Sequence, residues 1–298
     1  MVLFVHNRYR TTGGEERAVE ELSWLVREKL GEEALLLARD SSDTSRGEAL
    51  AGLLAGGVAP QDVARAVRLS GARVVHAHNL LPTLGWRALA AARRAGARVV
   101  LHLHQYRLVC AIGICYTRGE DCTRCHGRNT LPGVRLNCRA SVPEAVAYGT
   151  GLALWQRRLA QQADAVIVPS RFARERLRQL GAPLRWERVH VLPPPLRELE
   201  DPPVGGAGDG SYALLVSRLA AEKGVGVAID ACRMAGIELV IAGDGPDAQA
   251  LRARAEGAPV RFLGRVSPGE LAVLRRDAAI VSRGRCHDAG TYEGAARW

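Results

Sequence analysis

The chain has 298 residues, more than one domain usually holds, so we expect two domains that each bury their own core. Aromatic residues make up only 5% of the chain, and it shows no basic-then-apolar leader and no long apolar span, which leaves the cytoplasm as the expected location. The formal net charge of +10 favours an anionic partner: a nucleotide, a nucleic acid or an acidic membrane surface.

Short strand-like runs alternate with helical patterns along the whole chain, which is typical of open parallel sheets covered by helices. The first series predicts strands at residues 2–6, 34–38, 73–76, 98–103, 165–168 and 189–192. Helices are predicted between these strands at 15–30, 61–69, 84–94, 152–162 and 170–180. A second series predicts strands at 213–216, 238–241, 260–263 and 279–281, with helices at 223–234, 246–255 and 268–275.

A stretch rich in proline and glycine separates the two series. It starts at the prolines 193–195 and ends in the run 201–210, and this composition resists regular structure. We therefore predict one domain at residues 1–195, a linker at 196–210 and a second domain at 211–298. The predicted fold class is α/β, with two Rossmann-like, doubly wound domains that face each other across a cleft. Ligands of such sheets bind beyond the carboxyl ends of the strands.

Two glycines, Gly13 and Gly14, stand between the first predicted strand and the first predicted helix. Such a turn lets backbone N–H groups approach a phosphate closely, although a plain tight turn has the same composition. The spacing does not match the dinucleotide fingerprint Gly-x-Gly-x-x-Gly, so a nicotinamide cofactor is not expected.

Histidines gather near the ends of two predicted strands, in the runs Val-Val-His-Ala-His-Asn and Leu-His-Leu-His-Gln-Tyr. These histidines are His76, His78, His102 and His104. Because side chains alternate along a strand, His102 and His104 share one face, and the residue nearer the carboxyl end should face the ligand. We therefore expect an active-site role for His104 and structural roles for His76 and His102.

Five of the seven cysteines fall within a predicted insert at about residues 107–142. One run, Cys-x-x-Cys-His at 122–126, formally matches a c-type haem attachment motif. Haem attachment normally needs export, however, and disulfides are disfavoured in a reducing cytoplasm. The pattern instead predicts a structural zinc site with the ligands Cys110, Cys122, Cys125 and Cys138. Cys115 or His126 could replace one ligand, and reduced thiols without a metal are the alternative.

Two cations, Arg218 and Lys223, stand after the strand predicted at 213–216 and at the start of the following helix. A helix N-terminus carries partial positive charge, so cations are unfavourable there unless an anion is bound. A planar guanidinium and a compact ammonium together suit a diphosphate. The alternative is an exposed pair for which Glu222 is a partial counter-ion.

Several runs, taken in order, resemble one family over most of the chain. The bacterial retaining glycosyltransferases of GT-B fold, called glycosyl transferases group 1 or family 4, have a similar series. The resemblance implies that the chain transfers a sugar from a nucleotide-diphosphate donor to an acceptor with retention, and without a catalytic metal. It rests on Phe-Val-His-Asn-Arg-Tyr-Arg-Thr-Thr-Gly-Gly-Glu-Glu-Arg, Val-Val-His-Ala-His-Asn, Leu-His-Gln-Tyr-Arg-Leu-Val-Cys, Val-Pro-Ser-Arg-Phe, Ser-Arg-Leu-Ala-Ala-Glu-Lys-Gly, Ile-Ala-Gly-Asp-Gly-Pro and Phe-Leu-Gly-Arg-Val.

The resemblance also implies roles for individual residues. Arg218 and Lys223 match the family's pair that binds the donor diphosphate and stabilises charge on the leaving phosphate. Gly13 and Gly14 match the loop that closes over the phosphates and the sugar, and His104 matches a histidine that contacts the sugar. The nucleobase would be lined by Gly264, Arg265 and Val266.

The chain departs from the family pattern after residue 281. Asp288 could serve as the family's first acid there, but Ala296 stands where a Glu should bind the donor ribose and sugar, and the sequence stops at Trp298. We therefore expect an incomplete second domain, produced by truncation or a frameshift near residues 282–298. A catalytically impaired, donor-binding fragment is the resulting alternative.

The acceptor cannot be identified from the motifs. A glycan, a lipid-linked compound or a small molecule would each fit, and the basic charge allows peripheral contact with the inner membrane surface. A zinc-stapled, basic nucleic-acid-binding protein is a further alternative. Nucleic acid is not expected, because the arginines are dispersed and no aromatic residues interleave a basic face.

Overall fold

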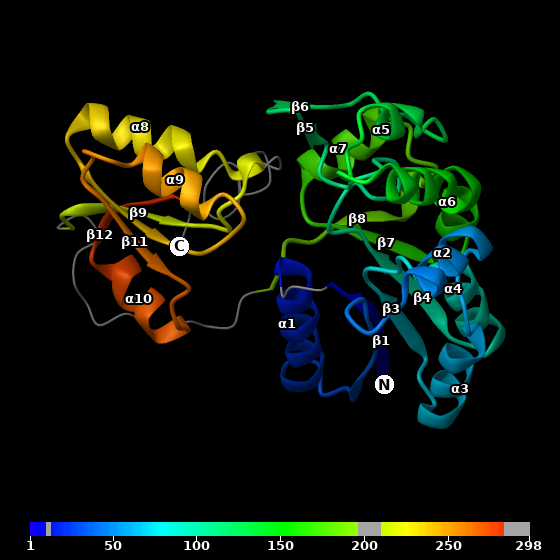
Figure 1. The fold of residues 1–298 in the computed structure, drawn as a ribbon. Coiled ribbons are helices and arrows are strands. Elements are labelled where there is room, and N and C mark those ends of the chain that lie inside the picture. Colours follow the sequence, from blue (N-terminus) through cyan, green and yellow to red (C-terminus); the bar gives the residue numbers. More distant parts are fainter. Residues whose placement is uncertain (10–12, 196–209, 283–298) are drawn as a thin grey trace. The chain divides into compact units, whose positions relative to one another are not determined.

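The computed structural model describes residues 1–9, 13–195 and 210–282 (Figure 1). These residues form two compact units, each built on its own parallel sheet. Most of the predicted linker, Asp288 and the atypical residues after Ser282 lie outside the described residues. In the described part of the chain, no helix combines the length and the apolar character needed to cross a bilayer.

The first unit has a six-stranded sheet in the order β2-β1-β3-β4-β7-β8, with all neighbours parallel. Its central strands are apolar over consecutive residues because helices cover both faces. Since β2 and β3 flank β1 on opposite sides, the winding direction reverses beside β1, and a ligand crevice is expected at the carboxyl ends there. The strands are β1 (Val2–Arg8), β2 (Ala34–Asp40), β3 (Val74–Ala77), β4 (Arg98–His102), β7 (Ala165–Val168) and β8 (Val189–Val191).

Helices cover both faces of this sheet (Figure 1). On one face α1 packs Val19 and Val26 against Phe4 of β1. On the other face the main core includes Val63 of α3 and Leu89 of α4. The helices are α1 (Gly14–Glu28), α2 (Arg46–Ala55), α3 (Pro60–Ser70), α4 (Gly85–Arg94), α5 (Leu131–Arg135), α6 (Val142–Gln161) and α7 (Arg171–Gln179), with a 3-10 turn at Trp186–Arg188 and a short hairpin of β5 (Tyr116–Thr117) and β6 (Glu120–Asp121).

The second unit has a four-stranded parallel sheet in the order β11-β10-β9-β12. Ile229 and Leu251, from α8 and α9, pack on one face, whereas Leu271 and Leu274 of α10 pack on the other (Figure 1). The elements are β9 (Tyr212–Val216), a 3-10 turn at Ala221–Lys223, α8 (Val225–Ala235), β10 (Glu238–Ala242), α9 (Ala248–Arg254), β11 (Val260–Gly264), α10 (Pro268–Arg276) and β12 (Ala278–Ser282).

The predicted α/β fold class, with Rossmann-like parallel sheets, is confirmed, and every predicted strand is present. The predicted helices are present as well, but α6 begins at Val142, ten residues before the predicted start. Two helices and a hairpin were not predicted: α2, the short helix α5 and β5–β6. They lie in two loops of the first unit, so the main differences lie there and not in the two large parallel sheets.

Candidate functional site

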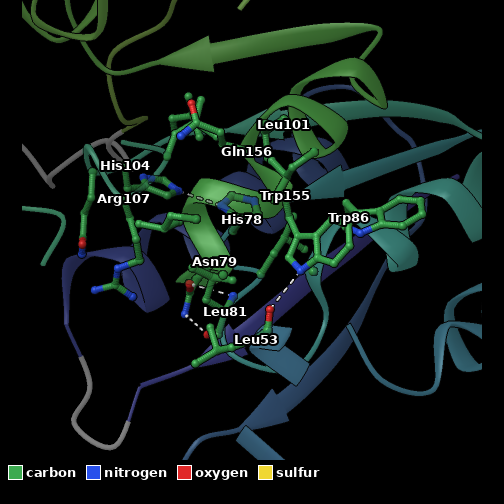
Figure 2. Close-up of a pocket in the computed structure, with 18 of the residues that line it drawn as sticks. Leu53, His78, Asn79, Leu81, Trp86, Leu101, His104, Arg107, Trp155 and Gln156 are labelled. Carbon is green, nitrogen blue, oxygen red and sulfur yellow. Dashed lines mark hydrogen bonds between the residues drawn. The ribbon is translucent and has the colours of Figure 1, made fainter. Parts of the chain in front are cut away.

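A pocket lies at the carboxyl ends of β1, β3 and β4 in the first unit, at the position where the winding reverses. It encloses about 690 Å³ of empty space, which includes part of its open mouth. Figure 2 shows His104 and Arg107 on one side of the pocket, and Trp155 and Trp86 on the other. The pocket therefore has a polar end beside the strand ends and an apolar end between α2, α4 and α6.

His104, the predicted active-site histidine, is on the polar side of the pocket. One of its ring nitrogens, Nε2, lies 2.7 Å from Nδ1 of His78, which follows β3 (Figure 2). Burial, followed by repulsion from His76 and His6, lowers the pKa of His104 to about 3. His104 is therefore neutral at physiological pH, and it can donate or accept a hydrogen bond without carrying charge.

His76 and His102, for which a structural role is predicted, lie in the buried part of the sheet next to this pair. Their rings stack at 5.4 Å with an interplanar angle of 17°, and they are 8% and 3% exposed. Burial lowers the pKa of His76 to about 4, and burial with repulsion from His104 and His76 lowers that of His102 to about 2. Nitrogen atoms of His76, His78 and His102 approach within 4.8 Å of one another. Lone pairs of nearly parallel rings do not converge on one point, so this stack packs the sheet and has no metal-site geometry.

Three side chains that the sequence analysis missed form a hydrogen-bonded chain at the polar end. The guanidinium of Arg107 donates to the hydroxyl of Tyr9 at 3.0 Å, and this hydroxyl donates to Oε2 of Glu15 at 3.0 Å. Burial, only partly offset by Arg107, raises the pKa of Glu15. The signal in the sequence was the Arg in the run Leu-His-Gln-Tyr-Arg, three residues after His104.

The turn containing Gly13 and Gly14 leads into α1, as predicted, but an internal carboxylate already occupies it. The N–H of Gly13 donates to Oε2 of Glu16 at 2.8 Å, and the N–H of Tyr9 donates to Oε1 of the same residue at 3.0 Å. A phosphate bound through the N–H of Gly13 would have to displace Glu16. Gly14 is exposed, and a Cβ added there would meet nothing within 4 Å.

In the second unit, Arg218 and Lys223 follow the carboxyl end of β9. Arg218 is exposed and Lys223 is half-buried, in the 3-10 turn that precedes α8. Within the described residues, neither side chain makes an ion pair or hydrogen bond with a protein group. A Cβ at Gly243 would clash with the carbonyl oxygen of Ser217, so glycine there lets the loop after β10 lie directly against the loop that carries Arg218.

The predicted nucleobase segment lies at the same edge of the second sheet. Gly264 ends β11 with a φ of 72°, and its carbonyl accepts the N–H of Gly243 at 2.6 Å. Arg265 is exposed and Val266 is half-buried. Arg218, Lys223 and this segment therefore share the carboxyl edge of one sheet, whereas His104 and Gly13 belong to the first unit. Asp288 lies outside the described residues.

The four predicted zinc ligands also come together. Cys110, Cys122, Cys125 and Cys138 line one small pocket of the first unit, and Cys115 joins them. A hydrogen bond from Cys115 holds the pKa of Cys110 low, at about 6. In the described part of the chain, no three of these sulfur atoms approach within 4.8 Å of one another. Among the described residues, the ring nitrogens of His76, His78 and His102 are the one group of possible metal ligands that lies this close together.

Comparison with known families gives one match to this sequence. The model described as a glycosyl transferase 4-like domain matches residues 12–195, which is more than half of the chain. No curated protein matches the sequence significantly.

Comparison with solved structures finds similar folds at low sequence identity. The structure of Anabaena HepE in complex with UDP is 16% identical, with a TM-score of 0.54, over 94% of this chain and 72% of that one. AviGT4, a glycosyltransferase involved in avilamycin A biosynthesis, is 16% identical, with a TM-score of 0.47, over 94% of this chain and 68% of that one. Staphylococcus aureus TarM is 12% identical, with a TM-score of 0.43, over 70% of this chain and 36% of that one. Of these three, only HepE has a TM-score above 0.5, and at 16% identity its likeness shows the fold alone.

Proposed function

We propose that this chain, which belongs to the glycosyl transferase 4-like family, moves a sugar from a nucleotide-diphosphate donor to an acceptor with retention of configuration at the sugar. The observation that carries the proposal is the neutral, pocket-lining His104 at the winding reversal of the first sheet. A neutral imidazole in that position can hydrogen-bond a sugar hydroxyl. It does not add positive charge where the reacting sugar itself becomes positive.

Arg218 and Lys223 are proposed to bind the donor diphosphate. Both follow β9 at the carboxyl edge of the second sheet, where ligands of Rossmann-like sheets bind. Two cations held there in advance stabilise the negative charge that develops on the leaving diphosphate, so no catalytic metal is required. Gly264, Arg265 and Val266, at the same edge, are proposed to line the nucleobase.

The acceptor is proposed to bind in the pocket of the first unit. Its apolar end contains Leu53, Trp86 and Trp155, so this part would take an apolar group of the acceptor. The acceptor hydroxyl would then lie at the polar end, near His104. An amphipathic compound, such as a lipid-linked or aromatic acceptor, matches this gradient better than a fully polar glycan does. For a lipid-linked acceptor the basic chain would meet an anionic membrane surface at the cytoplasmic side.

Calorimetry with UDP and with ADP tests the donor site. Arg218→Ala and Lys223→Ala should each weaken the binding of the preferred nucleotide by about 1.5–3 kcal/mol, since each removes a charge-assisted contact. Arg233→Ala is the matched control: Arg233 lies in the last turn of α8, away from the carboxyl edge, and pairs with Asp230 at 3.2 Å. Equal affinity in all three variants would place the diphosphate elsewhere.

Donor hydrolysis, followed by proton NMR of the released sugar, tests the reaction and its stereochemistry. A sugar first released with the donor's own anomeric configuration supports retention, whereas the opposite anomer contradicts it. His104→Ala should lower kcat/KM by about 10- to 100-fold and leave nucleotide affinity unchanged. His190→Ala, which changes an exposed histidine of β8, is the control and should keep the wild-type rate.

A further inference from the structure

A second pocket of the first unit is lined by sulfur. Its five cysteines come from three separate segments: the loop after β4, the hairpin region and the turn after α5. Cys110 and Cys125 are each 7% exposed, and Cys115 is 1% exposed. None of the five takes part in a disulfide. A small pocket that collects this many free thiols from distant positions calls for a chemical explanation beyond core packing.

Backbone contacts hold the three segments together around this pocket. A Cβ added to Gly133 of α5 would lie 2.6 Å from the Cβ of Ala111 and 3.6 Å from the sulfur of Cys125, so glycine permits the close approach. The N–H of Cys138 donates to the carbonyl of Gly133 at 3.0 Å. Across the pocket, the N–H of Cys122 donates to the carbonyl of Cys115 at 2.8 Å. These contacts hold α5, the turn after it and the hairpin region against the pocket.

We propose that this pocket binds one zinc ion through the thiolates of Cys110, Cys122, Cys125 and Cys138. Four thiolates make a closed tetrahedral site, and soft sulfur ligands select zinc over calcium or magnesium. A zinc–sulfur bond of about 2.3 Å requires neighbouring sulfurs roughly 3.8 Å apart. No three sulfurs approach within 4.8 Å of one another in the described residues, so zinc would have to draw them inward through rotation of the cysteine side chains about χ1.

Cys115 is the fifth thiol, and it is assigned no bond to the metal. Its backbone is left-handed, with a φ of 52°, and its carbonyl fixes Cys122 through the hydrogen bond described above. Its role is therefore to hold the start of the hairpin and, through its hydrogen bond, the thiol of Cys110. The Cys-x-x-Cys pair 122 and 125 with one thiol from each flanking segment already completes four ligands.

The zinc ion would also position the pocket that contains His104. The loop that follows β4 lines both pockets, with His104 and Arg107 on the first and Cys110 on the second. Within this loop the N–H of Cys110 donates to the carbonyl of Tyr106 at 2.8 Å, and the N–H of Tyr106 donates to that of Gly113 at 2.8 Å. A metal bound to Cys110 therefore limits the motion of His104 and Arg107.

Metal analysis of untagged protein tests the site. The wild type should contain close to one zinc per chain, and cobalt substitution should give the intense near-ultraviolet charge transfer of thiolate ligands. Cys122→Ser and Cys125→Ser should lose both signals, whereas Cys115→Ser and Cys232→Ser, which lies in the second unit, should keep them. Zinc that persists in Cys122→Ser and Cys125→Ser, or wild-type protein that contains no metal and reacts freely at all five thiols, would overturn the proposal.

Hydrogen exchange tests the effect on the loop, and it needs no sugar transfer. Stripping zinc from wild-type protein with a strong chelator should speed the exchange of residues 104–113, while β10 of the second unit should exchange as before. Bound zinc with unchanged exchange of that loop would overturn its positioning role. Because wild-type protein is used, a variant that fails to fold does not block the test. A transferase without zinc would refute this inference and leave the proposed function intact.

Discussion

Glu16 is the residue on which the start of α1 depends. Its carboxylate accepts the N–H groups of Gly13 and Tyr9 and lies 3.4 Å from Nε2 of His6. Burial alone would raise the pKa of Glu16, but these hydrogen bonds lower it to about 2. Glu16→Ala leaves two backbone donors without their acceptor, so we expect the free energy of unfolding at neutral pH to fall by about 1.5–3 kcal/mol. Denaturant titration measures this loss.

Glu20→Ala is the matched control for Glu16→Ala. Glu20 lies one turn further along the same helix with an exposed side chain, and its removal should change stability by less than about 0.5 kcal/mol. An equal loss in both variants would mean that general helix propensity or charge, and not the two backbone hydrogen bonds, is responsible. The prediction would also fail if Glu16→Ala kept wild-type stability.

At the scale of the element, β3, β4 and the residues just after them place four histidines in one stack, with His76, His78 and His102 buried and His104 half-buried. Burial is the main cause that lowers the pKa of each, to about 4 in His76, 3 in His104 and 2 in His102, and well below the usual range in His78. Unfolded histidines bind protons near pH 6.5, so below that pH the unfolded state takes up more protons than the folded one. The stability of the folded state is therefore greatest above about pH 6.5 and falls at lower pH, with a slope that approaches about 1.4 kcal/mol per pH unit for each histidine below about pH 5.5.

Denaturant titrations between about pH 7 and pH 5 test this slope. His102→Gln cannot titrate, so its slope, averaged over this range, should be smaller than that of the wild type by about 1 kcal/mol per pH unit. His6 and Glu16 also act on the stack. His6 adds to the lowering of the pKa of His104, whereas the carboxylate of Glu16 raises that pKa. His190→Gln, on exposed β8, should keep the wild-type slope. A slope that stays the same in His102→Gln would show that the stack does not control acid stability.

The predicted helix at 152–162 begins too late, and the omitted first half of α6 contains glycines that serve packing. Gly149 and Gly151 lie in this half, and the helix continues through both. A Cβ at Gly149 would lie 3.2 Å from Oγ1 of Thr130, and one at Gly151 would lie 3.1 Å from the carbonyl oxygen of Leu53. These glycines let α6 approach its neighbours. The strands were predictable because runs of apolar, β-branched residues are a local signal in the sequence. The contacts of the α6 glycines give no such signal, because they join residues that are far apart in the sequence.

The candidate site shows the same division between local and distant information. His104, Arg218 and Lys223 could be selected because each follows a strand end in a recognisable run. The apolar end of the pocket was missed because Trp86 and Trp155 come from α4 and α6 and meet only in the folded chain, where their ring centroids are 5.9 Å apart. That the two tryptophans form one wall of this pocket is information that only the packing of these helices provides.

At the scale of the whole molecule, the net charge of +10 has two competing explanations. A nucleic-acid-binding protein neutralises several phosphates at once, so its affinity falls steeply as salt is raised. A protein that binds one nucleoside diphosphate through Arg218 and Lys223 has two such charge contacts, and its affinity falls much less. The salt dependence of the two kinds of ligand therefore separates these explanations.

We expect weak, nonspecific binding of duplex DNA that disappears near about 0.2 M salt, while the preferred nucleotide still binds there. The DNA contacts come from arginines dispersed over the chain, so Arg218→Ala should leave DNA binding almost unchanged and weaken the nucleotide. Fluorescence anisotropy with labelled DNA and calorimetry with UDP or ADP measure the two affinities over one salt series. Tight DNA binding that survives about 0.2 M salt, in a protein that binds neither nucleotide, would favour the nucleic-acid hypothesis over sugar transfer.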